Sequence, residues 1–152
     1  MKHLVLSSIA VAALLLSGCS KKTPEADTTS TSNADRLAAL ASQIQSEVGT
    51  VYFDFDKFNI RADQQGTINN NAALFNQAGA ESLTVKVEGN CDEYNYALGL
   101  KRATAAKDAL VAQGVNESRI SVVSYGESNM ACTEHSKECD AQNRRDEFKV
   151  GF

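Results

Sequence analysis

Two oppositely charged side chains stand near each other in the segment from Glu88 to Leu110, and they are the residues best suited to bind a ligand. Asp92 lies just before a predicted helix, and Arg102 lies on that helix. A carboxylate accepts hydrogen bonds from an ammonium group, while a guanidinium clamps a carboxylate in bidentate fashion. The pair therefore indicates a site for a small zwitterion. The alternatives are that Asp92 only caps a turn or helix, and that Arg102 is a structural ion-pair partner.

The elements that must position these residues follow from the hydrophobic pattern. Residues 51–56 alternate as in a strand, with Val51, Phe53 and Phe55 expected to face a core. The same reasoning predicts strands at 83–88, 120–125 and 147–152, and helices at 63–78 and 96–113. This order predicts one α+β domain of about 100 residues, with helices on one face of the sheet and the other face more exposed.

The N-terminal residues predict export. Lys2 is followed by an apolar run from Leu4 to Leu16, which is shorter than the roughly 20 residues of a membrane-spanning helix. The ending Leu-Ser-Gly-Cys19 resembles the lipobox of bacterial lipoproteins, which implies that Cys19 is acylated and anchors the chain to a membrane. Ser20 replaces the Asp usual in lipoproteins kept in the inner membrane, so the resemblance points to the periplasmic face of the outer membrane.

Three regions are expected: a signal peptide at 1–18, a lipidated N-terminus and flexible tether at 19–49, and a domain at 50–152. Residues 21–33 are rich in Thr, Ser and Ala and read as a solvated tether. Residues 35–48 form either a short helix that needs to dock or an extension of the tether. The net charge is −4, and −5 once the signal with Lys2 is removed. This acidic balance disfavours binding to nucleic acid.

Five ordered motifs carry a resemblance to a known family. They are VYFDFDKFNI at 51–60, VEGNCDE at 87–93, YNYALGLKRA at 94–103, VSYGE at 123–127 and QNRR at 142–145. Together they resemble the OmpA-like peptidoglycan-binding domain, and within it the peptidoglycan-associated lipoproteins of the Pal type. The resemblance covers nearly all of residues 50–152. It implies a β-α-β-α-β-β sandwich with a mixed four-stranded sheet, and no enzymatic activity or cofactor.

The resemblance also implies a function. The domain would bind peptidoglycan noncovalently through the diaminopimelate of the stem peptide, with contacts from Asp56, Asn90, Asp92, Leu98 and Arg102. It would tether the outer membrane to the cell wall within the Tol-Pal system and support envelope integrity and cell division. The implied protein partner is TolB, which competes for an overlapping face. Asn143, Arg144 and Arg145 are interpreted mainly as residues that stabilise the fold.

The chain departs from the family beside the expected pocket. Pal-like sequences usually have about five more residues where Glu93 here meets Tyr94. A helix that began directly after Asp92 would place Arg102 about 15 Å along it, whereas an N-cap at Asn95 reduces this to about 10 Å. We therefore expect binding that is kept but weakened or altered. The alternative function is a TolB-binding module with weak wall binding. Asp146 is a smaller departure, because the family often has an apolar residue there.

The remaining cysteines allow three interpretations. In an oxidising compartment Cys132 and Cys139, seven residues apart, are expected to form a disulfide, which leaves Cys91 as a small buried residue. A zinc site that adds Cys91 and His135 to this pair is a weaker alternative, because paired CxxC knuckles are absent from the sequence. A hydrolase built on Cys91 and His135 lacks any accompanying oxyanion feature. We expect no metal.

Overall fold

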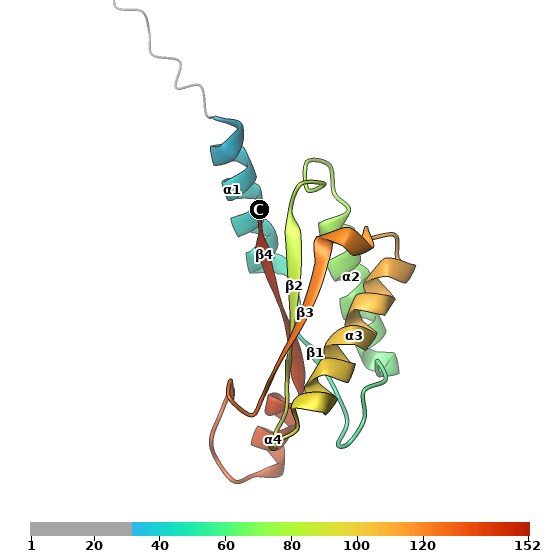
Figure 1. The fold of residues 1–152 in the computed structure, drawn as a ribbon, viewed down its shortest axis with the longest axis vertical. Helices are drawn as coiled ribbons and strands as arrows, with labels where there is room; N and C mark the ends of the chain where they lie inside the picture. The colour runs from blue at the N-terminus through green and yellow to red at the C-terminus, as the bar shows by residue number, and fades with distance from the viewer. Residues whose placement is uncertain (1–31) are drawn as a thin grey trace, which may run out of the picture. The chain divides into compact units, whose positions relative to one another are not determined.

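The computed structural model describes residues 32–152, which form a four-stranded sheet covered by helices (Figure 1). The strand order is β1-β4-β2-β3, with β2 parallel to β3 and β4 antiparallel to both β1 and β2. The α+β class and the mixed four-stranded sheet are thereby confirmed. The strands are β1 (Val51–Tyr52), β2 (Thr84–Asn90), β3 (Ile120–Gly126) and β4 (Arg145–Gly151). The helices are α1 (Asn33–Glu47), α2 (Gln65–Phe75), α3 (Tyr96–Ala112) and α4 (Lys137–Asn143), with 3-10 turns η1 (Ala62–Gln64) and η2 (Glu117–Arg119).

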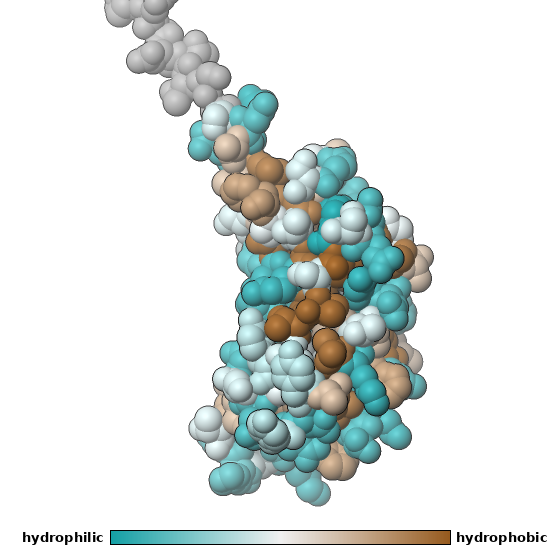
Figure 2. Space-filling model, in the orientation of Figure 1, coloured by the Kyte–Doolittle hydropathy of each residue, from teal (hydrophilic) through white to brown (hydrophobic). Residues whose placement is uncertain are grey.

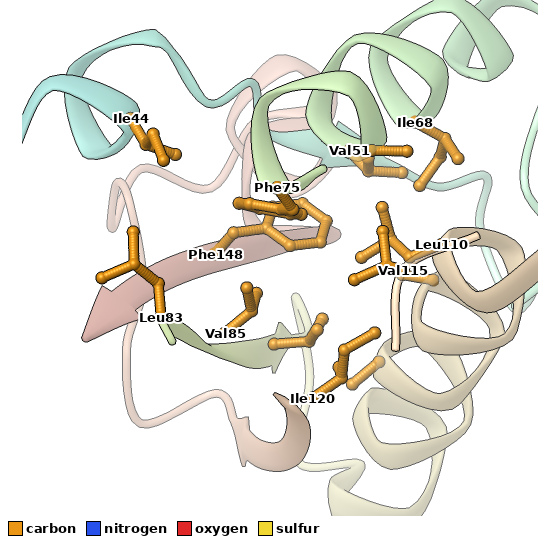
Figure 3. Packing of buried hydrophobic residues seen from close by; sticks show 14 of the residues in the cluster. Ile44, Val51, Ile68, Phe75, Leu83, Val85, Leu110, Val115, Ile120 and Phe148 are labelled. Atoms are coloured by element: carbon orange, nitrogen blue, oxygen red, sulfur yellow. The ribbon is translucent and has the colours of Figure 1, made fainter. Parts of the chain in front are cut away.

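The core lies between the sheet and the helices α2 and α3 (Figure 3). Val85 and Val87 of β2 are fully buried, whereas Lys86 between them is exposed, as expected for a strand with one covered face. The rings of Phe75 and Phe148 meet with their centroids 6.3 Å apart. Ion pairs lie along single strands, Lys86 with Glu88 on β2 and Lys149 with Glu147 on β4, and the exposed lysines of these pairs meet water. Figure 2 shows hydrophobic residues gathered in the middle of the view, between hydrophilic residues above and below.

Helix α1 belongs to the folded domain, so the predicted tether at 19–49 is too long. Ser32 and Asp35 form a capping box that starts the helix. Ile44 is fully buried in the core, and Gln45 bonds β4 twice, donating to Phe148 O at 3.0 Å and accepting from Val150 N at 2.9 Å. The domain therefore begins near Asn33 rather than at residue 50. The signal peptide and Cys19 lie outside the described residues.

Strand β1 is shorter than the predicted strand at 51–56. Phe53 is buried as expected, but Phe55 is 65% exposed, contrary to its predicted place in the core. The chain turns after Asp54, where Lys57 N donates to Asp54 O at 3.2 Å, and Asp56 adopts a left-handed conformation with φ 53°. Aspartate tolerates this conformation better than most residues. The turn carries Phe55 and Asp56 to the surface.

Candidate ligand-binding site

The expected site lies at one end of the sheet, where several separate segments meet. The C-terminal end of β2 leads into the start of α3, and the turn after β1 and the helix α4 lie at the same end (Figure 1). Gly89 makes this junction possible, because a Cβ atom there would collide with the carbonyl oxygen of Gly99 on α3. Helix and strand therefore approach each other closely directly beneath the site.

The shortened connection between β2 and α3 is closed by hydrogen bonds. Asn95 is the N-cap of α3, and its side chain accepts from Leu98 N at 2.9 Å. This is the second of the two geometries considered from the sequence. The backbone N–H of Cys91 donates to Gly126 O at 2.9 Å, and the Cys91 thiol donates to Asn95 O at 3.3 Å. Residues 91–95 thus form a tight bridge between the end of β2 and the helix.

Arg102 lies in the interior, in contrast to the expected clamp on a ligand. Its side chain is 0% exposed and stacks on Phe53, with the guanidinium carbon 5.4 Å from the ring centroid. Backbone carbonyls take its donors: Nε bonds Lys57 O at 2.9 Å, Nη1 bonds Asn90 O at 3.2 Å and Nη2 bonds Asp54 O at 3.2 Å. Burial lowers the pKa of Arg102. In this structure Arg102 ties the turn after β1 to the end of β2.

Asp92 forms an ion pair with Arg144, a residue that was not expected at the site. Its Oδ2 accepts from Arg144 Nη1 at 2.7 Å, and the two side chains are only 8% and 13% exposed. Arg144 is held in place because its Nε also donates to Phe53 O at 3.2 Å. The sequence reasoning missed Arg144 as a site residue and assigned it to the fold. The signal was present in the QNRR motif, which ends where β4 begins at the same end of the sheet.

The other expected contact residues are distributed between surface and interior. Asp56 is exposed in the turn after β1. Asn90 is fully buried, where its side chain donates to Glu88 O at 3.0 Å and accepts from Asn129 at 3.1 Å. Leu98 is 6% exposed. Only Asp56 and Asp92 of the five therefore offer a side chain to a ligand in this conformation, while Asn90, Leu98 and Arg102 support the site from below.

Two hollows of opposite charge flank the ion pair of Asp92 and Arg144. The acidic hollow, of about 190 Å³, contains four carboxylate side chains. Its lining is Asp92, Glu127, Met130, Cys132, Thr133, Glu134, His135, Asp140 and Asn143. The basic hollow, of about 290 Å³, is lined by Phe55, Lys137, Asp140 and Arg144. Because Asp140 lines both, the hollows adjoin, and together they suit a small ligand that carries an ammonium and a carboxylate.

The loop over the acidic hollow is fixed by a disulfide between Cys132 and Cys139. Asn143 adds to this, because its side chain accepts from Ala131 N at 2.7 Å and donates to Cys132 O at 3.0 Å. The disulfide thus removes Cys132 and Cys139 from the four residues considered as zinc ligands. Within residues 32–152 no group of three or more His, Cys, Asp or Glu side chains is arranged to hold a metal ion. Cys91 is fully buried, and burial raises the pKa of its thiol, which makes it a poor nucleophile.

A buried carboxyl group lies close to Arg102. Asp146 on β4 is 0% exposed, and neither of its carboxylate oxygens has a hydrogen-bond partner among the described residues. Desolvation raises the pKa of Asp146 well above its usual value, and the opposing attraction of Arg102 does not cancel this effect. At this end of the sheet, the charged side chains of Arg102 and Asp146 are therefore buried below the exposed polar residues.

Comparison with known proteins agrees with this fold and this sequence pattern. Residues 52–145 match the model of the OmpA family. The chain belongs to the OmpA family. This match confirms the resemblance inferred from the five motifs, and the relatives described next confirm its closeness to the Pal-type lipoproteins. None of the helices in residues 32–152 of this OmpA-family chain has the length and apolar character needed to cross a membrane.

Several relatives of this OmpA-family chain are named peptidoglycan-associated lipoprotein. That of Mesorhizobium japonicum is 38% identical over 144 residues, which cover 89% of this chain and 84% of the relative. That of Pasteurella multocida is 41% identical, over 67% of this chain and 70% of the relative. The crystal structure of the peptidoglycan-associated lipoprotein from Burkholderia pseudomallei superimposes with a TM-score of 0.62 at 32% identity, covering 67% of this chain and 89% of that one.

Proposed function

We propose that this protein binds peptidoglycan noncovalently, through the diaminopimelate residue of the stem peptide. The observation that carries the proposal is the ion pair of Asp92 and Arg144, set between an acidic and a basic hollow at the end of the sheet. Similarity to relatives named peptidoglycan-associated lipoprotein supports the choice of ligand. The free end of diaminopimelate carries one ammonium and one carboxylate, which matches the charges of the two hollows.

The role in the cell is part of the same proposal. Acylation at Cys19 would anchor the chain to the periplasmic face of the outer membrane, and the residues between Cys19 and α1 would serve as the tether. With its domain on the cell wall, the protein would link the two layers as part of the Tol-Pal system and support envelope integrity and cell division. The lipobox-like ending at Cys19 supports the anchor.

Co-sedimentation with purified cell wall tests the proposal. We expect residues 32–152 to pellet with peptidoglycan and Asp92→Asn to weaken this binding about 10-fold or more, because a charge-assisted hydrogen bond is lost. Glu81→Gln is the matched control, because Glu81 is exposed and lies before the first residue of β2, at the end of the strand away from Asp92. Absence of wild-type protein from the pellet at all wall concentrations would refute the proposal.

A second candidate function is favoured by exposed apolar side chains near the same end. Tyr94 is 88% exposed, Tyr96 56% and Phe58 45%. A hollow of about 340 Å³ lies beside them and is lined by Phe58, Leu100, Lys101, Thr104, Ala105 and Asp108. Such a surface suits a protein partner. The family resemblance suggests TolB, with the shortened connection to α3 weakening wall binding. A pull-down with TolB, run beside the cell-wall assay, separates the two functions.

A further inference from the structure

We propose that the outer side of α3 pairs with the same side of a second copy of this chain. The two helices would run antiparallel about a two-fold axis that passes between Thr104 and Ala105. This inference goes beyond the proposed function and does not rest on it. The outer side, called the α3 face below, consists of six exposed or half-buried residues, which are Ala97, Lys101, Thr104, Ala105, Asp108 and Ala112.

The spacing of these six residues places them on one stripe of the helix. An α-helix turns by about 100° per residue, so their side chains fall within a sector of about 100° along roughly four turns. The other side of α3 carries Ala103, Ala106 and Leu110, which are buried in the core. The helix thus packs one side on the domain and presents the α3 face to solvent.

The sizes of the residues on the α3 face are symmetric about its midpoint. Thr104 and Ala105 are both small and lie next to the proposed axis. Two further small residues, Ala97 and Ala112, lie equally far from the axis at the two ends of the face. In a two-fold dimer each residue meets its counterpart across the axis, so small residues meet small residues and the two helices can approach closely.

The charges of the α3 face are complementary under the same symmetry. Lys101 and Asp108 lie equally far from the axis on opposite sides of it, and both are exposed. Within residues 32–152 neither of them takes part in an ion pair. On one helix they stand about 10 Å apart, whereas the two-fold axis places Lys101 of each copy opposite Asp108 of the other. One dimer therefore contains two such ion pairs.

Apolar side chains beside the α3 face add a hydrophobic component. Four of the six residues line the hollow of about 340 Å³ described above, and Phe58 and Leu100 complete its lining. Phe58 is 45% exposed and Leu100 is 38% exposed. The ammonium of Lys101 lies 5.7 Å from the centre of the Phe58 ring, which holds this cation at the edge of the face. A second copy would cover apolar groups that water now reaches.

A second copy of this chain fits these observations because one axis accounts for both the sizes and the charges of the α3 face. The contact is small. Helix α3 has 17 residues and is about 25 Å long, so the pair of helices buries less than the roughly 800 Å² per partner of a standard interface. We therefore expect a weak dimer, with a dissociation constant on the order of 10–100 µM.

The experiment is sedimentation equilibrium of residues 32–152, which contain the whole sheet and the core. Lys101→Glu and Asp108→Lys each place like charges opposite each other at two points, so each should weaken dimerisation about 10-fold or more. The double variant exchanges the two charges and should return to within about 3-fold of the wild type. Arg36→Glu, on the exposed surface of α1, is the matched control and should leave dimerisation unchanged.

A further variant tests the close approach of the helices without a change of charge. Thr104→Gln places a longer side chain next to the axis, at a residue that is exposed in the single chain. Glutamine favours a helix at least as well as threonine does, so the free energy of unfolding should not fall. Dimerisation should weaken about 10-fold, because the helices can no longer approach as closely. This variant decides the question if a charge variant fails to fold.

Three results would overturn the proposal. The first is a wild type that stays monomeric up to a concentration on the order of 1 mM. The second is a dimer that the single variants leave intact, which would place its interface elsewhere. The third is a double variant as weak as the single ones, since exchange restores complementarity only between two copies of one face. A monomeric wild type that binds TolB only when Lys101 is present would assign the α3 face to the second function considered above.

Discussion

Replacement of Asp146 by valine is expected to stabilise the domain. The carboxyl group is fully buried on β4, and both its oxygens lack hydrogen-bond partners among the described residues. An unsatisfied buried polar group costs about 1–3 kcal/mol, so Asp146→Val should raise the free energy of unfolding by a similar amount. Valine also suits a strand. The midpoint of thermal unfolding should rise by about 4 °C for each kcal/mol in a domain of this size.

The pH dependence of this effect has a definite sign. Desolvation raises the pKa of Asp146 in the folded state above its value in the unfolded chain. The folded state therefore binds more protons than the unfolded state once the pH exceeds about 4, where an unperturbed aspartate ionises. The wild type should lose stability, relative to Asp146→Asn and Asp146→Val, as the pH rises from about 4 toward the pKa of the folded state. Below that window, asparagine and aspartate should differ little.

The assay is urea unfolding of wild type, Asp146→Val and Asp146→Asn at several pH values from about 3.5 to about 8, a range that begins below the pKa of an unperturbed aspartate. Two results would support the reasoning. Asp146→Val is more stable than wild type at neutral pH, and the difference in the free energy of unfolding between Asp146→Asn and wild type grows as the pH rises. Loss of stability in both variants at neutral pH would contradict it. That result would mean that Asp146 is ionised in the fold and compensates the buried charge of Arg102.

Three further substitutions test how the site is built. Gly89→Ala should lower the free energy of unfolding by about 3 kcal/mol, because the new methyl group would meet the carbonyl oxygen of Gly99; unchanged urea unfolding would contradict this close approach. Replacing Cys132 and Cys139 together by alanine should lower the free energy of unfolding by about 2–3 kcal/mol. It should also weaken binding of the stem peptide, because the disulfide fixes the loop that lines the acidic hollow; binding equal to that of wild type would show that this loop is not needed. Ile44→Ala should cost about 2–5 kcal/mol in the same assay, and a loss well below about 1 kcal/mol would mean that α1 is not part of the cooperative unit.

The fold could be predicted where periodicity spans several residues. The alternation at 83–88 and the apolar spacing along 96–113 gave β2 and α3 almost at their observed bounds. The pattern failed at 51–56, where Phe55 continues the alternation but leaves the core. Strand β1 ends at Tyr52, and the chain turns at residues 54–57, where Asp56 is left-handed; alternation alone does not reveal such a turn. Helix α4 also escaped prediction, because a seven-residue polar helix tied by a disulfide has little local signal.

The site could be predicted only in part. Asp92 was identified, and the spacing of Arg102 from Leu98 correctly placed it near the apolar side of α3, but not how deeply it is buried. The ion pair of Asp92 with Arg144 joins residues 52 positions apart. No local pattern specifies a contact of that kind, since it depends on how α4 and the end of β2 are brought together by the tertiary fold.

The central claim is that the end of the sheet around Asp92 holds a diaminopimelate end group. Titration of residues 32–152 with a diaminopimelate-containing stem peptide, followed by calorimetry, tests it most directly. The account predicts saturable binding that falls by about 10-fold or more in Asp92→Asn and is unchanged in Glu81→Gln. Absence of saturable binding, or equal binding by Asp92→Asn and wild type, would contradict it.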